Sequence, residues 1–254
     1  MKPDYSKFSP EDTAKMEEIT GVPAKAMLVQ SGLLPTPPKG AVVLDNACGG
    51  GVVTSHLFGA LGKTTDVRAV CGDFEDYMVN SSAERIKKNG WNAEAVVADA
   101  QALPFPDNHF SHNLMNFGIQ VIPDAALVVK ESFRVLKSGG RLGMTTWISP
   151  GWLDSFKIAI EGFTMPPVFT GLYSTKESIA GLITAAGFTN VDVQGIKFEH
   201  TDDMGRYLKY MGEVAKPALQ GEAGKKYEAH MRKQHGDGDF VLTWEAFVIT
   251  AEKP

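Results

Sequence analysis

The segment VVLDNACGGGVVT, residues 42–54, constrains the fold of this chain more than any other stretch. It passes from β-branched and apolar residues through an aspartate into a cluster of small residues. Glycine is needed wherever the backbone turns to positive φ, as a tight strand-to-helix turn requires. The segment therefore predicts a buried strand, a glycine-rich loop and the start of a helix.

The rest of the chain continues this alternation of strands and helices. Nearly continuous apolar runs, typical of strands buried on both faces, follow as DVRAVCGD, NAEAVVAD, FSHNLMN and RLGMTTW. Two longer strand patterns, NVDVQGIKFEH and DFVLTWEAFVITAE, come near the end, and the second alternates cleanly enough to favour antiparallel pairing. The predicted fold class is α/β: a Rossmann-like, mainly parallel seven-stranded sheet with helices on both faces and an antiparallel C-terminal strand.

Helical periodicity and capping residues predict the helices between these strands. One helix is expected to open at Asp124 and to close at Gly139, and another to open at Ser174, which has capping-box spacing to Glu177. The amino-terminal region carries two short helical patterns, EDTAKMEEI and PAKAMLVQSGLL. We expect four segments: an N-terminal helical arm at 1–40, a Rossmann-like core at 41–200, a helical cap insert at 201–238 and the final strand of the core sheet at 239–254.

Composition narrows the class of protein. A chain of 254 residues with 43% apolar residues can fill a substantial core. The formal net charge of −5 at pH 7 provides no basic surface for a phosphate backbone, so nucleic acid is not an expected partner. No apolar stretch is long enough to span a bilayer and no secretion signal is recognisable, which favours the cytosol. The two cysteines, Cys48 and Cys71, are expected to be buried thiols.

The glycine loop is expected at the edge where open α/β sheets bind ligands, although a turn that holds no ligand is the alternative. A dinucleotide would favour a third glycine where this loop has Thr54. Asp45, at the very end of the first strand, would repel a pyrophosphate and attract a cation. Asp73 and Asp99 end the next two strands, so we expect three carboxylates in one cleft. This pattern favours S-adenosylmethionine, a sulfonium with an ammonium group, with its ribose on Asp73 and its adenine on Asp99.

In the order and spacing of its motifs the chain resembles the class I S-adenosylmethionine-dependent methyltransferases, especially the small-molecule branch that includes the ubiquinone and menaquinone methyltransferases. The resemblance rests on VVLDNACGGGVVT, GDFEDYMV, ADAQALPFPDNHFS and VIPDAALVVKESFRVLKSGGRL, within about residues 41–147. It implies that the first motif approaches the methionine portion of the cofactor, that the acid after the second strand holds the ribose, and that the acid after the third strand contacts adenine. The implied cofactor-binding residues are Asp45, Ala47, Gly49, Gly51, Asp73, Asp99 and Ala100.

Two features depart from that family pattern. Many relatives have an aspartate after a phenylalanine early in the fourth strand, where this chain has Ser111 after Phe110. After that strand, where relatives often have histidines, the chain reads NFGIQVIPD. We therefore expect Asn116 beside the cofactor and Phe117 beside the substrate, at the mouth of the cleft. Phe74, directly after the ribose carboxylate, is expected to stack on adenine, with core packing as the alternative.

The segments that would surround an acceptor are rich in aromatic residues and methionine, which favours an apolar pocket for a small molecule. Trp147, at the end of the fifth strand, is the first choice for the pocket lining. Tyr207 and Met211 are expected to join it from the cap, with packing of the cap onto the core as the alternative. Tyr5 and Phe8, in the N-terminal arm, are expected to close over the cofactor.

No residue is assigned as a catalytic base, because each of the six histidines is expected to be structural or solvated. No carboxylate cluster apart from the cofactor acids predicts a metal site. The sequence thus predicts a methyltransferase that acts on a small, largely apolar metabolite, with oxygen as the expected acceptor atom and nitrogen or carbon as alternatives. Two other interpretations stay open: a binding protein that uses this scaffold without methyl transfer, and a nicotinamide-dependent oxidoreductase, which Asp45 disfavours.

Overall fold

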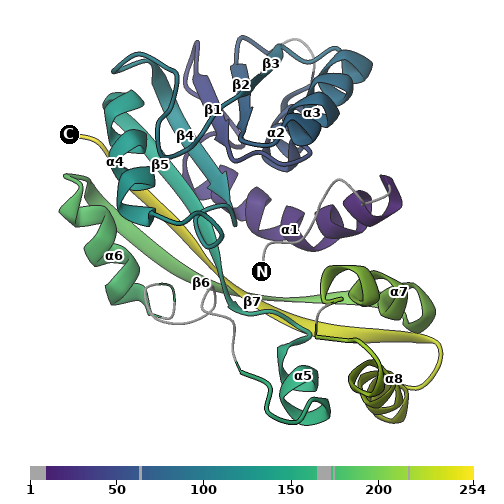
Figure 1. Ribbon diagram of the computed structural model, residues 1–254. Helices are drawn as coiled ribbons and strands as arrows, with labels where there is room; N and C mark the ends of the chain where they lie inside the picture. The colour runs from purple at the N-terminus through teal and green to yellow at the C-terminus, as the bar shows by residue number, and fades with distance from the viewer. Residues whose placement is uncertain (1–9, 63–64, 165–172, 174, 217) are drawn as a thin grey trace.

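Seven strands form a single sheet in the computed structural model, which describes residues 10–62, 65–164, 173, 175–216 and 218–254 (Figure 1). The strands are β1 (Val42–Asn46), β2 (Arg68–Asp73), β3 (Ala93–Val97), β4 (Phe110–Asn116), β5 (Leu136–Ser149), β6 (Thr189–Asp203) and β7 (Asp239–Glu252). Their order across the sheet is β3-β2-β1-β4-β5-β7-β6, and β7 runs antiparallel to both of its neighbours. The fold class predicted from the sequence is confirmed.

Helices cover both faces of this sheet. They are α1 (Pro10–Gln30), α2 (Val52–Leu61), α3 (Asp76–Asn89), α4 (Ala125–Val135), α5 (Leu153–Ala159), α6 (Lys176–Ala185), α7 (Met204–Val214) and α8 (Glu222–His235). Val43 of β1 packs in one buried cluster with α1 and α2, whereas the next residue, Leu44, packs in a second cluster with α4 and α6. Because both faces of the strand are covered, successive residues are apolar, as the sequence predicted.

The N-terminal region forms one helix where the sequence predicted two. α1 continues through Pro23, although an interior proline costs a helix about 3 kcal/mol. Residues beyond the proline, such as Met27 and Leu28, are fully buried against the sheet, and this packing offsets that cost. His112 of β4 holds the end of the helix, because its Nε2 lies 3.2 Å from the Ser31 carbonyl oxygen. Burial lowers the pKa of His112 to about 4, so the ring is neutral at physiological pH.

Two helix boundaries differ from the sequence prediction. α4 ends at Val135 and not at Gly139, because Leu136 already pairs with Phe110 of β4. The N–H of Gly139 donates to the Lys253 carbonyl at 2.7 Å, so this glycine belongs to β5, where that strand pairs with the end of β7. α6 begins at Lys176 with Thr175 as its N-cap, whose hydroxyl accepts the Ser178 N–H at 3.2 Å. The predicted cap, Ser174, lies outside the described residues.

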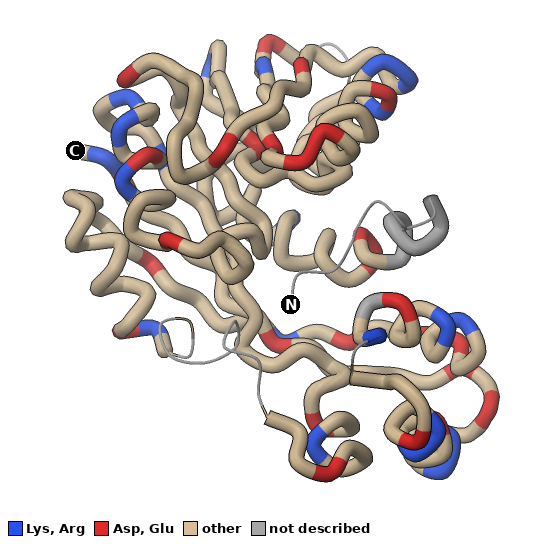
Figure 2. Tube along the Cα trace, viewed as in Figure 1, with Lys and Arg blue, Asp and Glu red and all other residues tan. Residues whose placement is uncertain are grey.

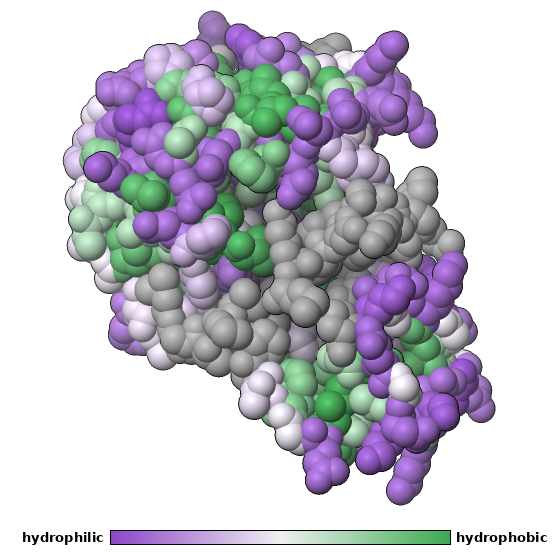
Figure 3. Space-filling view, viewed as in Figure 1, coloured by the Kyte–Doolittle hydropathy of each residue, from purple (hydrophilic) through white to green (hydrophobic). Residues whose placement is uncertain are grey.

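The two last strands extend beyond the core and carry the helices expected in the cap (Figure 1). α7 and α8 occupy the connection between β6 and β7, and α5 packs against α8. These helices contribute to a buried cluster rich in aromatic residues and methionine. α7 and α8 carry both acidic and basic residues (Figure 2), and much of the surface over them is hydrophilic in the space-filling view (Figure 3). The division into four segments stays a prediction. Among the described residues, no helix has the length and apolar character needed to cross a bilayer.

Candidate functional site

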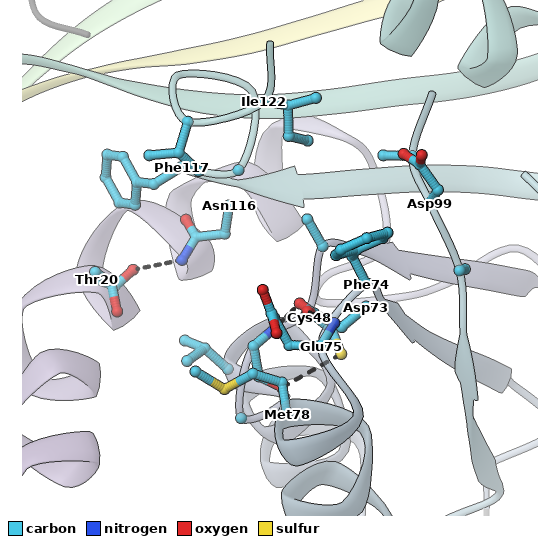
Figure 4. A pocket seen from close by; sticks show the side chains of 18 of the residues that line it. Thr20, Cys48, Asp73, Phe74, Glu75, Met78, Asp99, Asn116, Phe117 and Ile122 are labelled. Atoms are coloured by element: carbon cyan, nitrogen blue, oxygen red, sulfur yellow. Dashed lines mark hydrogen bonds between the residues drawn. The ribbon is translucent and has the colours of Figure 1, made fainter. Parts of the chain in front are cut away.

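A pocket of about 470 Å³ lies at the carboxyl-terminal edge of the parallel strands (Figure 4). The loops that follow β1, β2, β3 and β4 form most of its wall, and α1 closes one side. Asp99 lies toward one end of the pocket, and Phe117 and Thr20 lie toward the other. Of the residues predicted for the site, the pocket brings together Ala47, Gly49, Asp73, Phe74, Asp99, Ala100, Asn116 and Phe117.

The glycine loop after β1 is built from backbone in the left-handed region. Ala47 has φ 53°, Gly49 has φ 54° and Gly51 has φ 77°. The space where Gly49 would carry a Cβ is open, and Gly49 lines the pocket, so the loop offers bare backbone to a ligand. Gly51 lies outside the lining: it is the N-cap of α2, and a Cβ there would lie 3.3 Å from the Ser82 hydroxyl oxygen. Its role in the structure is the strand-to-helix turn.

Asp45 also lies outside the pocket lining, beneath the loop. Its Oδ2 accepts two hydrogen bonds from Thr54 of α2, one from the backbone N–H at 3.0 Å and one from the hydroxyl at 2.8 Å. Burial raises the pKa of Asp45 to about 7, and the two Thr54 hydrogen bonds oppose that rise. The sequence argument placed a fully ionised Asp45 beside the ligand. The structure instead gives this carboxyl group a buried position from which it anchors the glycine loop to α2.

Asp73, at the end of β2, orders the neighbouring backbone and faces the pocket. Its Oδ2 accepts the Gly49 N–H at 2.9 Å, and its Oδ1 accepts the Glu75 N–H at 3.0 Å. A carboxylate has about four lone-pair positions, so acceptor capacity remains for a pair of hydroxyl groups. This arrangement fits the predicted contact with a ribose.

Asp99 and Phe74 mark the opposite end of the pocket from Phe117 and Thr20 (Figure 4). The Asp99 Oδ1 accepts both the backbone N–H and the side-chain amide of Gln101, at 2.9 and 3.2 Å. Phe74 lines the pocket and is 63% exposed, so it does not pack in the core, which was the alternative. An exposed ring beside a fixed carboxylate fits an adenine, which offers a π-face and an amino group.

The end of β4 is held in a strained turn beside the glycine loop. Phe117 has φ 61°, a conformation that is rare for a bulky residue. Its N–H donates to the Thr145 hydroxyl oxygen at 3.0 Å, and that hydroxyl donates to the Asn116 Oδ1 at 2.7 Å. The next residue, Gly118, approaches the loop so closely that a Cβ would lie 2.8 Å from the Cβ of Ala47. Strain concentrated in this way is common at ligand sites.

The residues predicted to contact the substrate lie at different depths. Phe117 lines the pocket, and Trp147 stacks behind it with ring centroids 3.9 Å apart and an interplanar angle of 13°. Trp147 therefore supports the lining and does not form it. Tyr207 and Met211 are buried inside the cap, where the Tyr207 hydroxyl lies 2.7 Å from that of Tyr227. Their alternative role, packing of the cap, is the one that the structure supports.

Sequence reasoning missed the part of the wall that comes from α1. Met16 and Thr20, one helical turn apart, line the pocket, and the Thr20 carbonyl accepts the Asn116 side-chain amide at 3.2 Å. The arm residues predicted to close over the cofactor, Tyr5 and Phe8, lie outside the described residues. The i, i+4 spacing of Met16 and Thr20, on either side of the charged pair Glu17 and Glu18, was the available signal.

The lining is chemically unequal at its two ends. Its ionisable side chains come from the β1 loop and the ends of β2 and β3: Cys48, Asp73, Glu75 and Asp99. The lining residues contributed by α1 and by the segment after β4 include no ionisable group among those described. The first end can bind polar groups through hydrogen bonds, whereas the second can position an apolar molecule.

Comparisons with known proteins agree with this geometry. The sequence model of the ubiE/COQ5 methyltransferase family matches residues 31–166. Methyltransferase ktnA of Aspergillus niger is 30% identical over 91% of this chain and 90% of its own length. The ubiquinone/menaquinone biosynthesis C-methyltransferase UbiE of Klebsiella pneumoniae is 30% identical over 61% of this chain and 68% of its own. Among solved structures, the YcgJ protein of Bacillus subtilis is similar in fold, with a TM-score of 0.63 and 19% identity over 91% of this chain and 98% of that one.

Replacing Thr54 by valine tests the anchor of the glycine loop. The variant removes one donor to the buried Asp45 carboxyl group, so its pKa should rise above about 7 and its ionised form should become costlier. In the wild type, the stability linked to the raised Asp45 pKa is present at acidic pH and is lost as the pH rises through about 7. Relative to the wild type, urea unfolding of the variant should show an additional loss of stability of about 1–2 kcal/mol at about pH 8.5 compared with about pH 6. The same loss at both pH values would contradict this role.

Replacing Asp73 by alanine tests the ribose contact. The variant loses a pocket carboxylate and frees the Gly49 N–H, so we expect S-adenosylmethionine to bind about 10- to 100-fold more weakly in a calorimetric titration. Asp76→Ala is the matched control, because Asp76 is exposed at the start of α3 and does not line the pocket. Equal affinities of the two variants would remove Asp73 from the binding site.

Proposed function

Because the chain belongs to the ubiE/COQ5 methyltransferase family, we propose that it transfers a methyl group from S-adenosylmethionine to an oxygen atom of a small, largely apolar metabolite. Methyltransferase activity and the use of this cofactor follow from membership of the family. The proposal concerns the acceptor. The observation that carries it is the unequal lining of the pocket: among the described residues, ionisable side chains line one end and only uncharged side chains line the other.

The residues of the pocket fit S-adenosylmethionine. Asp73 would hold the ribose hydroxyls, while Asp99 and Phe74 would hold the adenine. The bare backbone around Gly49 and the side-chain amide of Asn116 would lie along the methionine portion. When bound, the cofactor supplies an electrophilic methyl group on a positively charged sulfur. The protein has to hold the acceptor in line with that group, and such alignment is worth about 7–11 kcal/mol.

We place the acceptor at the end of the pocket formed by α1 and the segment after β4. Met16, Thr20, Phe117 and Ile122 provide its described wall. Trp147 fixes the Phe117 ring from behind by stacking, so the wall is pre-organised for an apolar molecule. Apolar walls also exclude water, which would otherwise solvate the reacting atoms.

The lack of an ionisable side chain on this described wall limits the acceptor chemistry. Without a general base, the acceptor has to ionise by itself or react as a neutral nucleophile. A phenol, a carboxylic acid or a neutral amine meets this requirement, whereas an unactivated alcohol does not. This reasoning supports oxygen as the acceptor atom. Nitrogen and carbon are the alternatives, and one relative is named as a C-methyltransferase.

Product analysis with methyl-labelled cofactor tests the proposal. The purified protein is incubated with phenols, quinone-like compounds and amines, and the position of the label in each product is assigned by NMR. We expect label on the oxygen of a phenolic or carboxylic compound. Label on carbon or nitrogen would overturn the choice of acceptor atom, and cofactor binding without transfer to any compound would support a protein that only binds it.

The pH dependence of the reaction tests whether the protein supplies a base. Across a series of substituted phenols, the rate at saturating cofactor should rise about tenfold per pH unit below the pKa of each phenol, because the ionised fraction does. The midpoint of the pH profile should therefore move with the acceptor. A single midpoint shared by all acceptors would reveal a titrating group of the protein and contradict the proposed absence of a base.

A further inference from the structure

One guanidinium group joins three elements that surround the cofactor pocket. Arg85 of α3 forms a bidentate pair with Glu17 of α1, with Nη1 2.8 Å from Oε2 and Nη2 2.7 Å from Oε1. The same group donates to the carbonyl oxygen of Gly50 in the glycine loop at 3.2 Å and to the hydroxyl of Ser55 in α2 at 2.6 Å. Arg85 therefore links α1 to the loop that forms the floor of the pocket.

Glu17 lies in the turn of α1 that faces the pocket. Met16 and Thr20 of this turn line the cavity, and the Thr20 carbonyl accepts the Asn116 amide on the opposite side. The Arg85–Glu17 pair and the Asn116–Thr20 hydrogen bond therefore hold this turn on two sides of the pocket opening. If the Arg85 contact is lost, the Asn116 contact, a single hydrogen bond of 3.2 Å, is the remaining described hydrogen bond between this turn and the cofactor core.

The neighbouring residues of α1 face the other way, toward the last strands and the cap. Glu18 lies 3.6 Å from His200 of β6 and 3.5 Å from Arg206 of α7. Ile19 is buried in the cluster that fills the cap. α1 thus lies between the cofactor core and the cap, as Figure 1 shows, and Glu17 is its ionic contact with α3.

The environment of the Arg85–Glu17 pair makes it stronger than an ordinary surface pair. The two side chains are 28% and 17% exposed, compared with 53% and 51% for the Arg68–Glu94 pair between β2 and β3. Exposed ion pairs contribute little to the stability of a fold, whereas bidentate pairs that are shielded from water contribute more. α1 also lies close to α2 at Gly21, where a Cβ would lie 2.3 Å from the His56 Nε2.

We infer that Arg85 is a positioning residue that makes retention of the cofactor depend on the docking of α1. Through Glu17 it holds the Met16–Thr20 turn over the pocket, and through the Gly50 carbonyl it holds the loop beneath. Loss of the pair leaves the Asp73 and Asp99 contacts in place, so the cofactor still enters but leaves faster. The inference rests on the assignment of the pocket to S-adenosylmethionine and not on the identity of the acceptor.

The test combines the variants Arg85→Met, Glu17→Gln and their double variant. Cofactor affinity is measured by calorimetry and the dissociation rate by rapid mixing. We expect each single variant to raise the dissociation rate, by about tenfold for Arg85→Met. The double variant should bind no more weakly than Arg85→Met, because both changes break the same contact. Arg68→Met, which breaks the exposed pair, is the matched control and should leave binding unchanged.

Hydrogen exchange provides a readout that a purely structural role would not move. Bound cofactor should slow exchange of the amides in the 16–20 turn of the wild type, and less so in Glu17→Gln, a conservative variant that is expected to fold. Wild-type binding in all variants, or losses that simply add in the double variant, would overturn the inference. Such a result is distinct from failure of the proposed function, in which the wild-type protein would bind the cofactor but transfer no methyl group to any acceptor.

Discussion

The hydrogen bonds from Thr54 to the buried Asp45 carboxyl group are the contacts on which the rest of the site depends. They tie the end of β1 to the first turn of α2 across the glycine loop. A buried carboxyl group is costly to ionise, and burial raises the pKa of Asp45 to about 7 even with both donors in place. Because the loop is held at Asp45 and at Thr54, its left-handed backbone conformation is stabilised.

The two sides of the pocket at this edge of the sheet differ in the charge of the side chains that line them. The ends of β2 and β3 bring carboxylates to one side of the pocket, and each carboxylate is oriented by nearby N–H groups. The segment after β4 turns back in a strained conformation and brings only uncharged side chains to the other side. The polar groups of the cofactor can therefore bind on the first side, while the second side offers contacts with uncharged side chains.

α1 completes this cavity from outside the sheet. Its contacts run to α3 through Glu17 and to the cap through Glu18 and Ile19, so the helix connects the cofactor core to the cap. None of these contacts is local in the sequence: Glu17 and Arg85 are far apart along the chain. Periodicity could predict a helix here, but it could not predict which of its faces would meet the pocket.

The sequence by itself determined the sheet, the glycine loop and the positions of Asp73 and Asp99, because strand ends and glycine turns are encoded by neighbouring residues. It did not determine that Asp45 lies beneath the loop, that Tyr207 and Met211 pack inside the cap, or that Trp147 stands behind Phe117. Nor did it predict the unbroken α1 through Pro23. These features were decided by tertiary packing, because burial and pairing with distant segments outweigh local preference and set the direction in which each side chain points.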